Sequence, residues 1–259
     1  MEEMHLQINE SKVTYRDEGE GEAILLIHGF CGSSEYWNNI IPELKNMFRV
    51  LAIDLPGHGG SAAQGNVNTI EQYATFIKDF LDSLNIEKVT MYGHSLGGYI
   101  TLAFAEAYHE RLSAFSLIHS TGFPDSEEAK KGRITSTQKI DSEGIEAFIE
   151  GLVPKLFSPD NLESQQENMK EVKKIGYETS SEGAKNALNA MKERKDRRDI
   201  LDNTTLPVLL LAGDADQLIP NENTFSANGE NITKVLLPGV GHMSMYEAPK
   251  SLVNAMKAF

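Results

Sequence analysis

Short apolar runs that alternate with helical patterns constrain this 259-residue chain more than any other feature. Runs such as AILLIH at 23–28 and PVLLLA at 207–212 are continuous, which suits strands buried on both faces of a parallel sheet. Two more polar segments at the start of the chain also read as strands. The expected strands cover residues 5–9, 13–16, 23–28, 48–53, 89–92, 113–118, 207–212 and 234–237.

Helical patterns lie between these runs. Residues 70–84 repeat apolar side chains at helical spacing, residues 96–108 are rich in Ala and Leu, and residues 249–258 form a further amphipathic segment. Strands that alternate with helices predict an α/β fold with a mostly parallel sheet.

Residues 122–200 break this alternation. They contain 30 charged residues among 79, against 32 among the other 180, and no convincing strand. Amphipathic patches at 145–152 and 184–191 indicate helices. We therefore expect a helical insertion at 122–200 that lies over the sheet and divides a single core into residues 1–121 and 201–259.

Composition excludes several classes of function. A formal net charge of −14 argues against binding to nucleic acid or to an anionic membrane surface. The single cysteine rules out an internal disulfide, and the seven histidines include no closely spaced pair, so no metal site is expected. The chain has no apolar run long enough to span a membrane and no secretory signal pattern, so we expect a cytoplasmic protein.

The strongest chemical signal is the pentapeptide GHSLG at 93–97. It follows an expected strand and opens an expected helix, which is the setting in which a G-x-S-x-G serine sits on a strained turn. Flanking glycines keep such a turn free of side-chain clashes. The pattern predicts that Ser95 is a nucleophile.

A serine nucleophile needs a histidine base, and the histidine needs an acid that orients it. Two segments after Ser95 place these residue types at the ends of expected strands. The strand at 207–212 is followed by Asp214 and Asp216, and the strand at 234–237 is followed by His242. From spacing alone, either aspartate remains possible.

Five motifs occur in an order that resembles the α/β-hydrolase fold superfamily, in its helical-cap esterase and lipase-like branch. The motifs are HGF at 28–30, DLPGHGGS at 54–61, GHSLG at 93–97, GDADQLIP at 213–220 and GH at 241–242. The resemblance implies a mostly parallel eight-stranded sheet flanked by helices, with the insertion as a cap. It also implies that Asp216 rather than Asp214 is the acid and that His242 is the base.

The resemblance further implies an oxyanion hole made by the backbone N–H groups of Phe30 and Leu96. We expect Phe30, Leu96 and Met243 to contact substrate, because they flank the catalytic positions. The expected activity is hydrolysis of carboxylic esters or thioesters with small to medium apolar acyl groups, without a cofactor or metal. The only expected partner is a small-molecule acyl substrate, and the sequence does not predict an oligomeric state.

The same fold leaves other functions open. These are carbon–carbon bond hydrolysis, a menaquinone-pathway synthase, an aminopeptidase, a perhydrolase, and a signalling protein that binds a ligand without turnover.

Overall fold

The expected strands form one eight-stranded sheet in the computed structural model, which describes residues 2–259. The strands are β1 (Met4–Ile8), β2 (Ser11–Glu18), β3 (Ala23–Ile27), β4 (Arg49–Ile53), β5 (Val89–His94), β6 (Leu112–Ile118), β7 (Val208–Gly213) and β8 (Ile232–Leu237). Their order in the sheet is β1-β2-β4-β3-β5-β6-β7-β8. Only the pairings of β1 with β2 and of β2 with β4 are antiparallel, so the expected α/β class and mostly parallel sheet are confirmed.

The apolar runs of the central strands are buried on both faces, as their continuity predicts. All six residues of β7 are buried, and four of five are buried in both β3 and β4. The prediction that each apolar run is buried on both faces is wrong for β8, where Leu236 is 47% exposed. β8 pairs on one side only, with β7, and therefore has an open edge.

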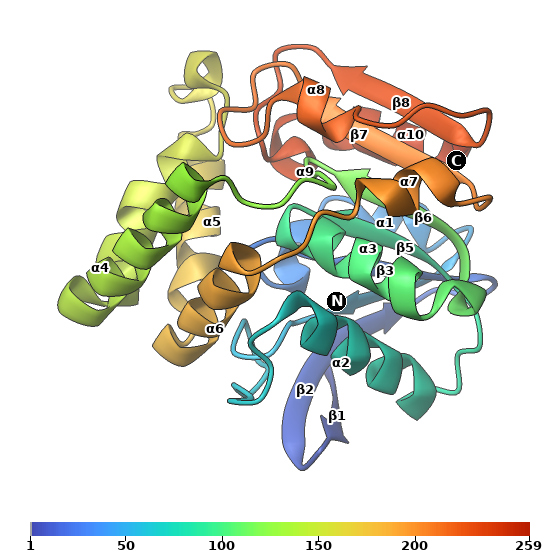
Figure 1. Cartoon of the computed structure of the whole chain (residues 1–259), viewed down its shortest axis with the longest axis horizontal. Coiled ribbons are helices and arrows are strands. Elements are labelled where there is room, and N and C mark those ends of the chain that lie inside the picture. The colour runs from blue at the N-terminus through green and yellow to red at the C-terminus, as the bar shows by residue number, and fades with distance from the viewer. Residues whose placement is uncertain (1) are drawn as a thin grey trace.

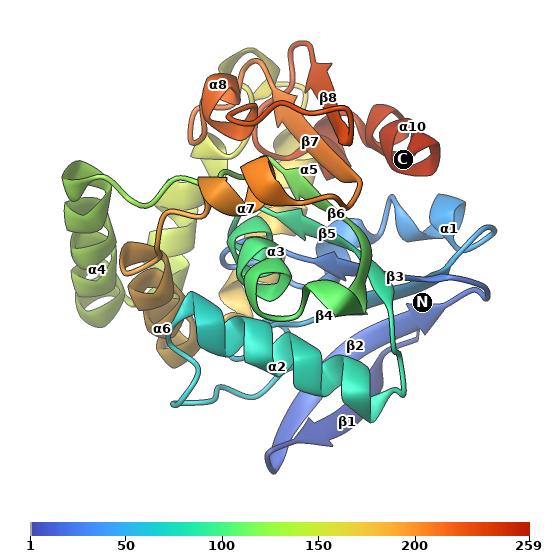
Figure 2. The ribbon, with the colours of Figure 1, turned by 45° about the vertical axis from the view of Figure 1, so that its right-hand side comes forward.

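Helices cover both faces of the sheet. Figure 2 shows α2 (Ile70–Ser83) and α3 (Leu96–Ala107) against one face, and α1 (Ile41–Leu44) and α10 (Pro249–Ala258) against the other. The start of α2 is fixed by a capping box, in which Thr69 and Gln72 each bond the other's backbone N–H. Two short helices, α8 (Asn221–Thr224) and α9 (Ser244–Glu247), lie in the loops after β7 and β8.

All of the regular secondary structure between β6 and β7 is helical. Its helices are α4 (Glu127–Leu152), α5 (Gln166–Tyr177), α6 (Ser181–Lys192) and α7 (Arg198–Asn203). Figure 1 shows α4, α5 and α6 grouped beside the sheet, and we call these three the insertion helices. The expected boundary at residue 200 falls inside α7, which packs on α3 instead.

Two glycines attach the insertion to the sheet. A Cβ at Gly183 would lie 2.6 Å from the Cα of Gly57, and Ser180 N donates to Gly57 O at 2.9 Å. Gly57 also has a φ of +76°, which an L side chain rarely adopts. Backbone therefore packs directly on backbone where α6 begins.

The two ends of the insertion meet at its base. Arg197 N donates to Gly122 O at 2.8 Å, and the Arg197 side chain, 4% exposed, bonds Glu71 of α2 and Glu106 of α3. These contacts hold the insertion at a fixed place on the body. Within residues 2–259, none of the helices has the length and hydropathy needed to cross a membrane.

Candidate active site

Ser95 occupies a strained turn between β5 and α3. Its φ of 51° and ψ of −111° lie outside the regions that non-glycine residues normally adopt. A Cβ at Gly93 would lie 2.3 Å from Gly97 O, and a Cβ at Gly97 would lie 2.3 Å from Ile27 O. Both glycines of the pentapeptide are therefore required by close backbone approach, as the motif predicts.

Asp216 and His242 meet at the carboxyl end of the sheet. The His242 Nδ1–H donates to Asp216 Oδ2 at 2.7 Å, and both side chains are almost completely buried. The other carboxylate oxygen, Oδ1, accepts from the backbone N–H groups of Leu218 and Ile219. These bonds fix the carboxylate and leave the Nε2 atom of His242 as its free ring nitrogen.

Asp214 is directed elsewhere. Its Oδ1 accepts from Gly239 N at 2.6 Å, which links the loops after β7 and β8. Of the two aspartates that spacing alone left open, the structure brings only Asp216 to His242.

His119, at the end of β6, is a third partner that the sequence analysis missed. Its Nδ1–H donates to the same Asp216 Oδ2 at 3.3 Å, and its side chain is fully buried. His119 has a φ of 48°, so its backbone is held in the left-handed region. A lone histidine at a strand end gives no sequence signal for this contact, because the contact joins residues 97 positions apart.

His94 contacts the backbone of His242. Its Nε2–H donates to the backbone oxygen of His242 at 2.9 Å, and the two rings lie 5.0 Å apart. Burial lowers the pKa of His94 well below its usual value, and His242 and His119 lower it further. His94 is therefore neutral and acts as a hydrogen-bond donor to the His242 backbone.

Burial also acts on the other members of this cluster. For Asp216, burial raises the pKa of the carboxyl, but His242 and His119 lower it more, so the carboxylate stays ionised. Burial lowers the pKa of His119, although the Asp216 carboxylate opposes the change. One buried carboxylate is thus shared by two imidazoles.

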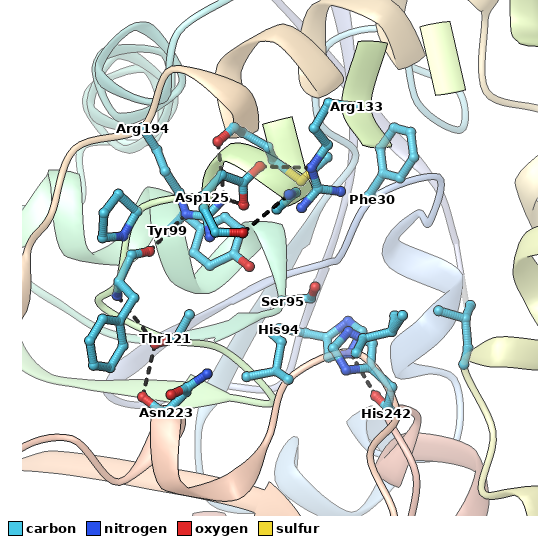
Figure 3. A pocket seen from close by; sticks show the side chains of 18 of the residues that line it. Phe30, His94, Ser95, Tyr99, Thr121, Asp125, Arg133, Arg194, Asn223 and His242 are labelled. Carbon is cyan, nitrogen blue, oxygen red and sulfur yellow. Dashed lines mark hydrogen bonds and ion pairs between the residues drawn. The ribbon is translucent and has the colours of Figure 1, made fainter. Parts of the chain in front are cut away.

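Ser95 and His242 line one cavity of about 360 Å³ (Figure 3). No hydrogen bond joins the Ser95 hydroxyl to His242 among the contacts of residues 2–259. Catalytic hydrogen bonds are often long in unliganded enzymes and shorten when substrate binds. The volume is within the usual range for a small-molecule site.

Comparison with known proteins identifies the family of this chain. The family described as alpha/beta hydrolase fold matches residues 22–249. The chain belongs to the alpha/beta hydrolase fold family.

Its relatives in this family include enzymes of several kinds. The chain is 30% identical over 246 residues to a dihydrolipoyllysine-residue acetyltransferase component of an acetoin cleaving system from Pseudomonas putida, covering 92% of this chain but only 63% of that protein. It is 24% identical to 2-hydroxy-6-oxo-6-(2'-aminophenyl)hexa-2,4-dienoic acid hydrolase from Metapseudomonas resinovorans, covering 95% of this chain and 86% of that one. Among solved structures, a malate-bound thermophilic esterase from Thermogutta terrifontis superposes with a TM-score of 0.91 at 27% identity, covering 100% of this chain and 97% of that chain.

Two N–H groups near Ser95 lack backbone partners in this hydrolase-fold chain. Leu96 N opens α3, and Phe30 N lies in the loop after β3; neither donates to another of the described residues. Gly29 brings this loop close to the turn, since a Cβ there would lie 2.6 Å from His94 Nδ1 and 3.3 Å from Ser95 Cβ.

The structure places two of the three expected substrate contacts in the cavity. Phe30 and Met243 line it, but Leu96, whose side chain belongs to the buried core, does not. Residues of the insertion supply much of the remaining apolar wall. The apolar lining of the cavity includes Phe30, Phe123, Leu152, Leu156, Met191, Leu218, Ile219 and Met243.

A charged cluster in the cavity was also missed. Asp125 accepts from Arg133 Nε at 3.0 Å and from Arg194 Nη1, and all three residues line the cavity (Figure 3). In the sequence, the charges of 122–200 served only to mark the insertion. Nothing in the spacing marks these three, since Arg194 lies 69 positions from Asp125.

A metal ion could in principle be held by three neighbouring side chains of the site, since ligand atoms of His119, Asp216 and His242 lie within 4.8 Å of one another. Two ligands of a tetrahedral zinc lie about 3.3 Å apart. Asp216 Oδ2 and His242 Nδ1 are 2.7 Å apart, which is the distance of a charge-assisted hydrogen bond. Hydrogen bonding within the cluster accounts for its geometry.

Proposed function

We propose that this chain is a serine hydrolase that cleaves carboxylic ester or thioester bonds of small-molecule acyl substrates. The observation that carries the proposal is the 2.7 Å bond from His242 to Asp216, in a cavity that also exposes Ser95 on a strained turn. Membership of the alpha/beta hydrolase fold family and the similarity to an esterase at 27% identity support it.

The reaction follows from the roles of the three side chains. His242 Nε2 takes the Ser95 proton while Ser95 Oγ attacks the substrate carbonyl and forms a tetrahedral intermediate. Asp216 stabilises the resulting imidazolium, which then protonates the leaving alcohol or thiol as the acyl-enzyme forms. A water molecule, deprotonated by His242, attacks the acyl-enzyme and releases the carboxylic acid and free Ser95.

The backbone N–H groups of Phe30 and Leu96 are suited to bind the oxyanion of that intermediate. Neither N–H is used within the described chain, and Leu96 opens a helix whose positive dipole end faces the site. One such donor typically stabilises the transition state by about 3 kcal/mol.

The insertion completes the site as a cap. Leu152, Leu156 and Met191 of the insertion face the same cavity as Ser95, so they supply an apolar wall for the substrate. This wall and the cavity of about 360 Å³ favour small to medium acyl groups over long chains.

The test is turnover of p-nitrophenyl esters of increasing acyl length by the wild type and by Ser95→Ala. We expect the wild type to prefer short and medium acyl chains, and Ser95→Ala to lose activity by roughly 10⁴-fold or more. Ser244→Ala is the matched control, since Ser244 is a buried serine that does not line the cavity. Equal turnover by the wild type and Ser95→Ala contradicts the proposal.

A further inference from the structure

The substrate cavity carries a positive charge in an acidic protein. Its lining includes two arginines, Arg133 and Arg194, and a single carboxylate, Asp125. The histidines of the lining are His94, which is neutral, and the base His242. The side chains that line the cavity thus carry a formal charge of +1, whereas the whole chain has −14; the Asp216 carboxylate lies behind His242 and outside the lining.

Most of the Arg194 guanidinium is bonded within the protein. Its Nε donates to Phe123 O at 3.0 Å, and its Nη1 donates to Asp125 Oδ1 and to Met191 O. Its guanidinium also stacks on the Tyr99 ring, 4.1 Å from the ring centre. With its side chain only 6% exposed, Arg194 neutralises Asp125 and has only its Nη2 group without a hydrogen-bond partner among residues 2–259.

Arg133 is only partly used. Its Nε donates to Asp125 Oδ2 at 3.0 Å, and no other hydrogen bond joins its guanidinium to residues 2–259. Its side chain is 27% exposed and lines the cavity with Ser95. Arg133 lines the same cavity as Ser95 and His242 (Figure 3), and neither of its Nη groups is hydrogen-bonded within residues 2–259.

We propose that Arg133 binds a carboxylate on the substrate, at the end of the acyl chain away from the scissile bond. Two adjacent Nη–H groups match the two oxygens of a carboxylate. One net positive charge balances a single carboxylate, while a phosphate monoester would leave an uncompensated charge. The proposal rests on the proposed function and narrows its substrates to half-esters or half-thioesters of dicarboxylic acids.

The test compares two substrates of the same shape. Monophenyl adipate ends in a carboxylate, and the phenyl ester of adipamic acid ends in an uncharged carboxamide; phenol release measures both. Wild type is expected to prefer the carboxylate. Arg133→Gln should reduce the carboxylate-to-carboxamide ratio of kcat/KM by about 10- to 100-fold.

Two further variants separate recognition from folding. Lys131→Gln removes one positive charge from an exposed position of the same helix, outside the cavity, and should leave the ratio unchanged. Arg133→Lys keeps the charge beside Asp125 but loses the paired donors, and should give an intermediate ratio. Asp125 keeps Arg194 in both Arg133 variants, so we expect them to fold.

The outcomes distinguish the two proposals. Turnover of both esters through Ser95, with the same ratio in wild type and Arg133→Gln, overturns the carboxylate site and leaves the hydrolase assignment intact. If neither ester is turned over, the hydrolase assignment is contradicted, and the carboxylate site is then tested by binding. Binding of monophenyl adipate to Ser95→Ala, followed by ligand-observed NMR, then decides the site: at least tenfold weaker binding after Arg133→Gln supports it, and equal binding overturns it.

Discussion

The sheet body and the insertion helices are built in different ways. The body buries continuous apolar strands and places its chemical groups on loops at the carboxyl edge of the sheet, with Ser95, His119, Asp216 and His242 each following a different strand. The insertion is rich in charge, contains no histidine, and contributes side chains from helices to the cavity. Under the proposed function, the body would set the reaction and the insertion would set the substrate.

The two regions are nevertheless in contact at His242. His242 N donates to Leu156 O at 2.8 Å, and a Cβ at Gly241 would lie 2.3 Å from Ser158 N. Glu247 reinforces this contact, since its Oε1 accepts from Ser158 N and its Oε2 from Gly241 N. A change in the insertion can therefore reach His242 through one short backbone contact.

The largest expected effect breaks the chemistry of the body. Asp216→Asn should lower kcat by about 10³- to 10⁴-fold, because the amide cannot stabilise the imidazolium or hold its tautomer. Asp214→Asn is the matched control and should change kcat by less than about threefold, since Asp214 only bonds Gly239. Steady-state kinetics on one ester measures both, and losses of similar size would contradict the choice of acid.

A smaller effect is expected where the insertion meets the body. Gly183→Ala places a Cβ 2.6 Å from the Gly57 Cα, so we expect a loss of about 1–3 kcal/mol in the free energy of unfolding. Gly132→Ala is the control, because a Cβ at Gly132 of α4 meets nothing within 4 Å and alanine favours helix. Urea unfolding should show destabilisation for the first variant and none for the second; equal stability of both would argue against tight docking.

Acid should weaken the body more than the insertion. Burial lowers the pKa of His28 from 6.5 to about 4. As the pH falls, His28 therefore becomes protonated in the unfolded chain before it does so in the folded chain. The stability from the neutral imidazole is complete above about pH 6.5 and falls as the pH drops toward 4, by about 2 kcal/mol at pH 5. Asp216 does not contribute to the loss of stability between pH 6.5 and pH 5. Its lowered pKa stabilises the folded chain, and this stabilisation is lost only when the pH falls below the ordinary value of 3.8.

Urea unfolding at pH 7 and pH 5 measures this slope. His28→Gln should reduce the pH dependence by about 2 kcal/mol, since glutamine does not titrate. The same slope in His28→Gln and wild type would show that His28 is not held neutral by burial.

The smallest effect concerns His119 as a positioning residue. His119→Ala removes a donor from Asp216 Oδ2, so we expect kcat to fall by about tenfold with little change in KM. The acidic limb of the kcat–pH profile should shift, because Asp216 then interacts with His242 alone. His119→Asn keeps a donor at the Nδ1 position and should recover most of the activity; no recovery and an unmoved profile would indicate a packing role only.

The body could be predicted from the sequence because its constraints are local. Apolar continuity marks β3 and β7, and the glycines at 93 and 97 mark the turn that Ser95 requires. Asp216 could be preferred over Asp214 only through the family resemblance. The exposed β8 was misread, since sequence does not show which strand lies at an edge.

The substrate side of the site could not be predicted in the same way. Arg133 of α4 and Arg194, in the loop after α6, reach the cavity through the packing of distant segments, and charged residues usually face solvent. Leu96 was expected to contact substrate because it adjoins Ser95, yet its side chain is buried in the core and does not line the cavity. Adjacency in sequence fixes the backbone N–H of Leu96 near the serine but not its side chain.

Covalent labelling with an alkyl phosphonofluoridate tests the central claim most directly. Peptide mass spectrometry should find one phosphonate per chain, on Ser95, with labelling abolished in Ser95→Ala and slowed in His242→Ala. A label on another residue, or undiminished labelling of Ser95→Ala, would contradict the assignment of Ser95 as a nucleophile activated by His242.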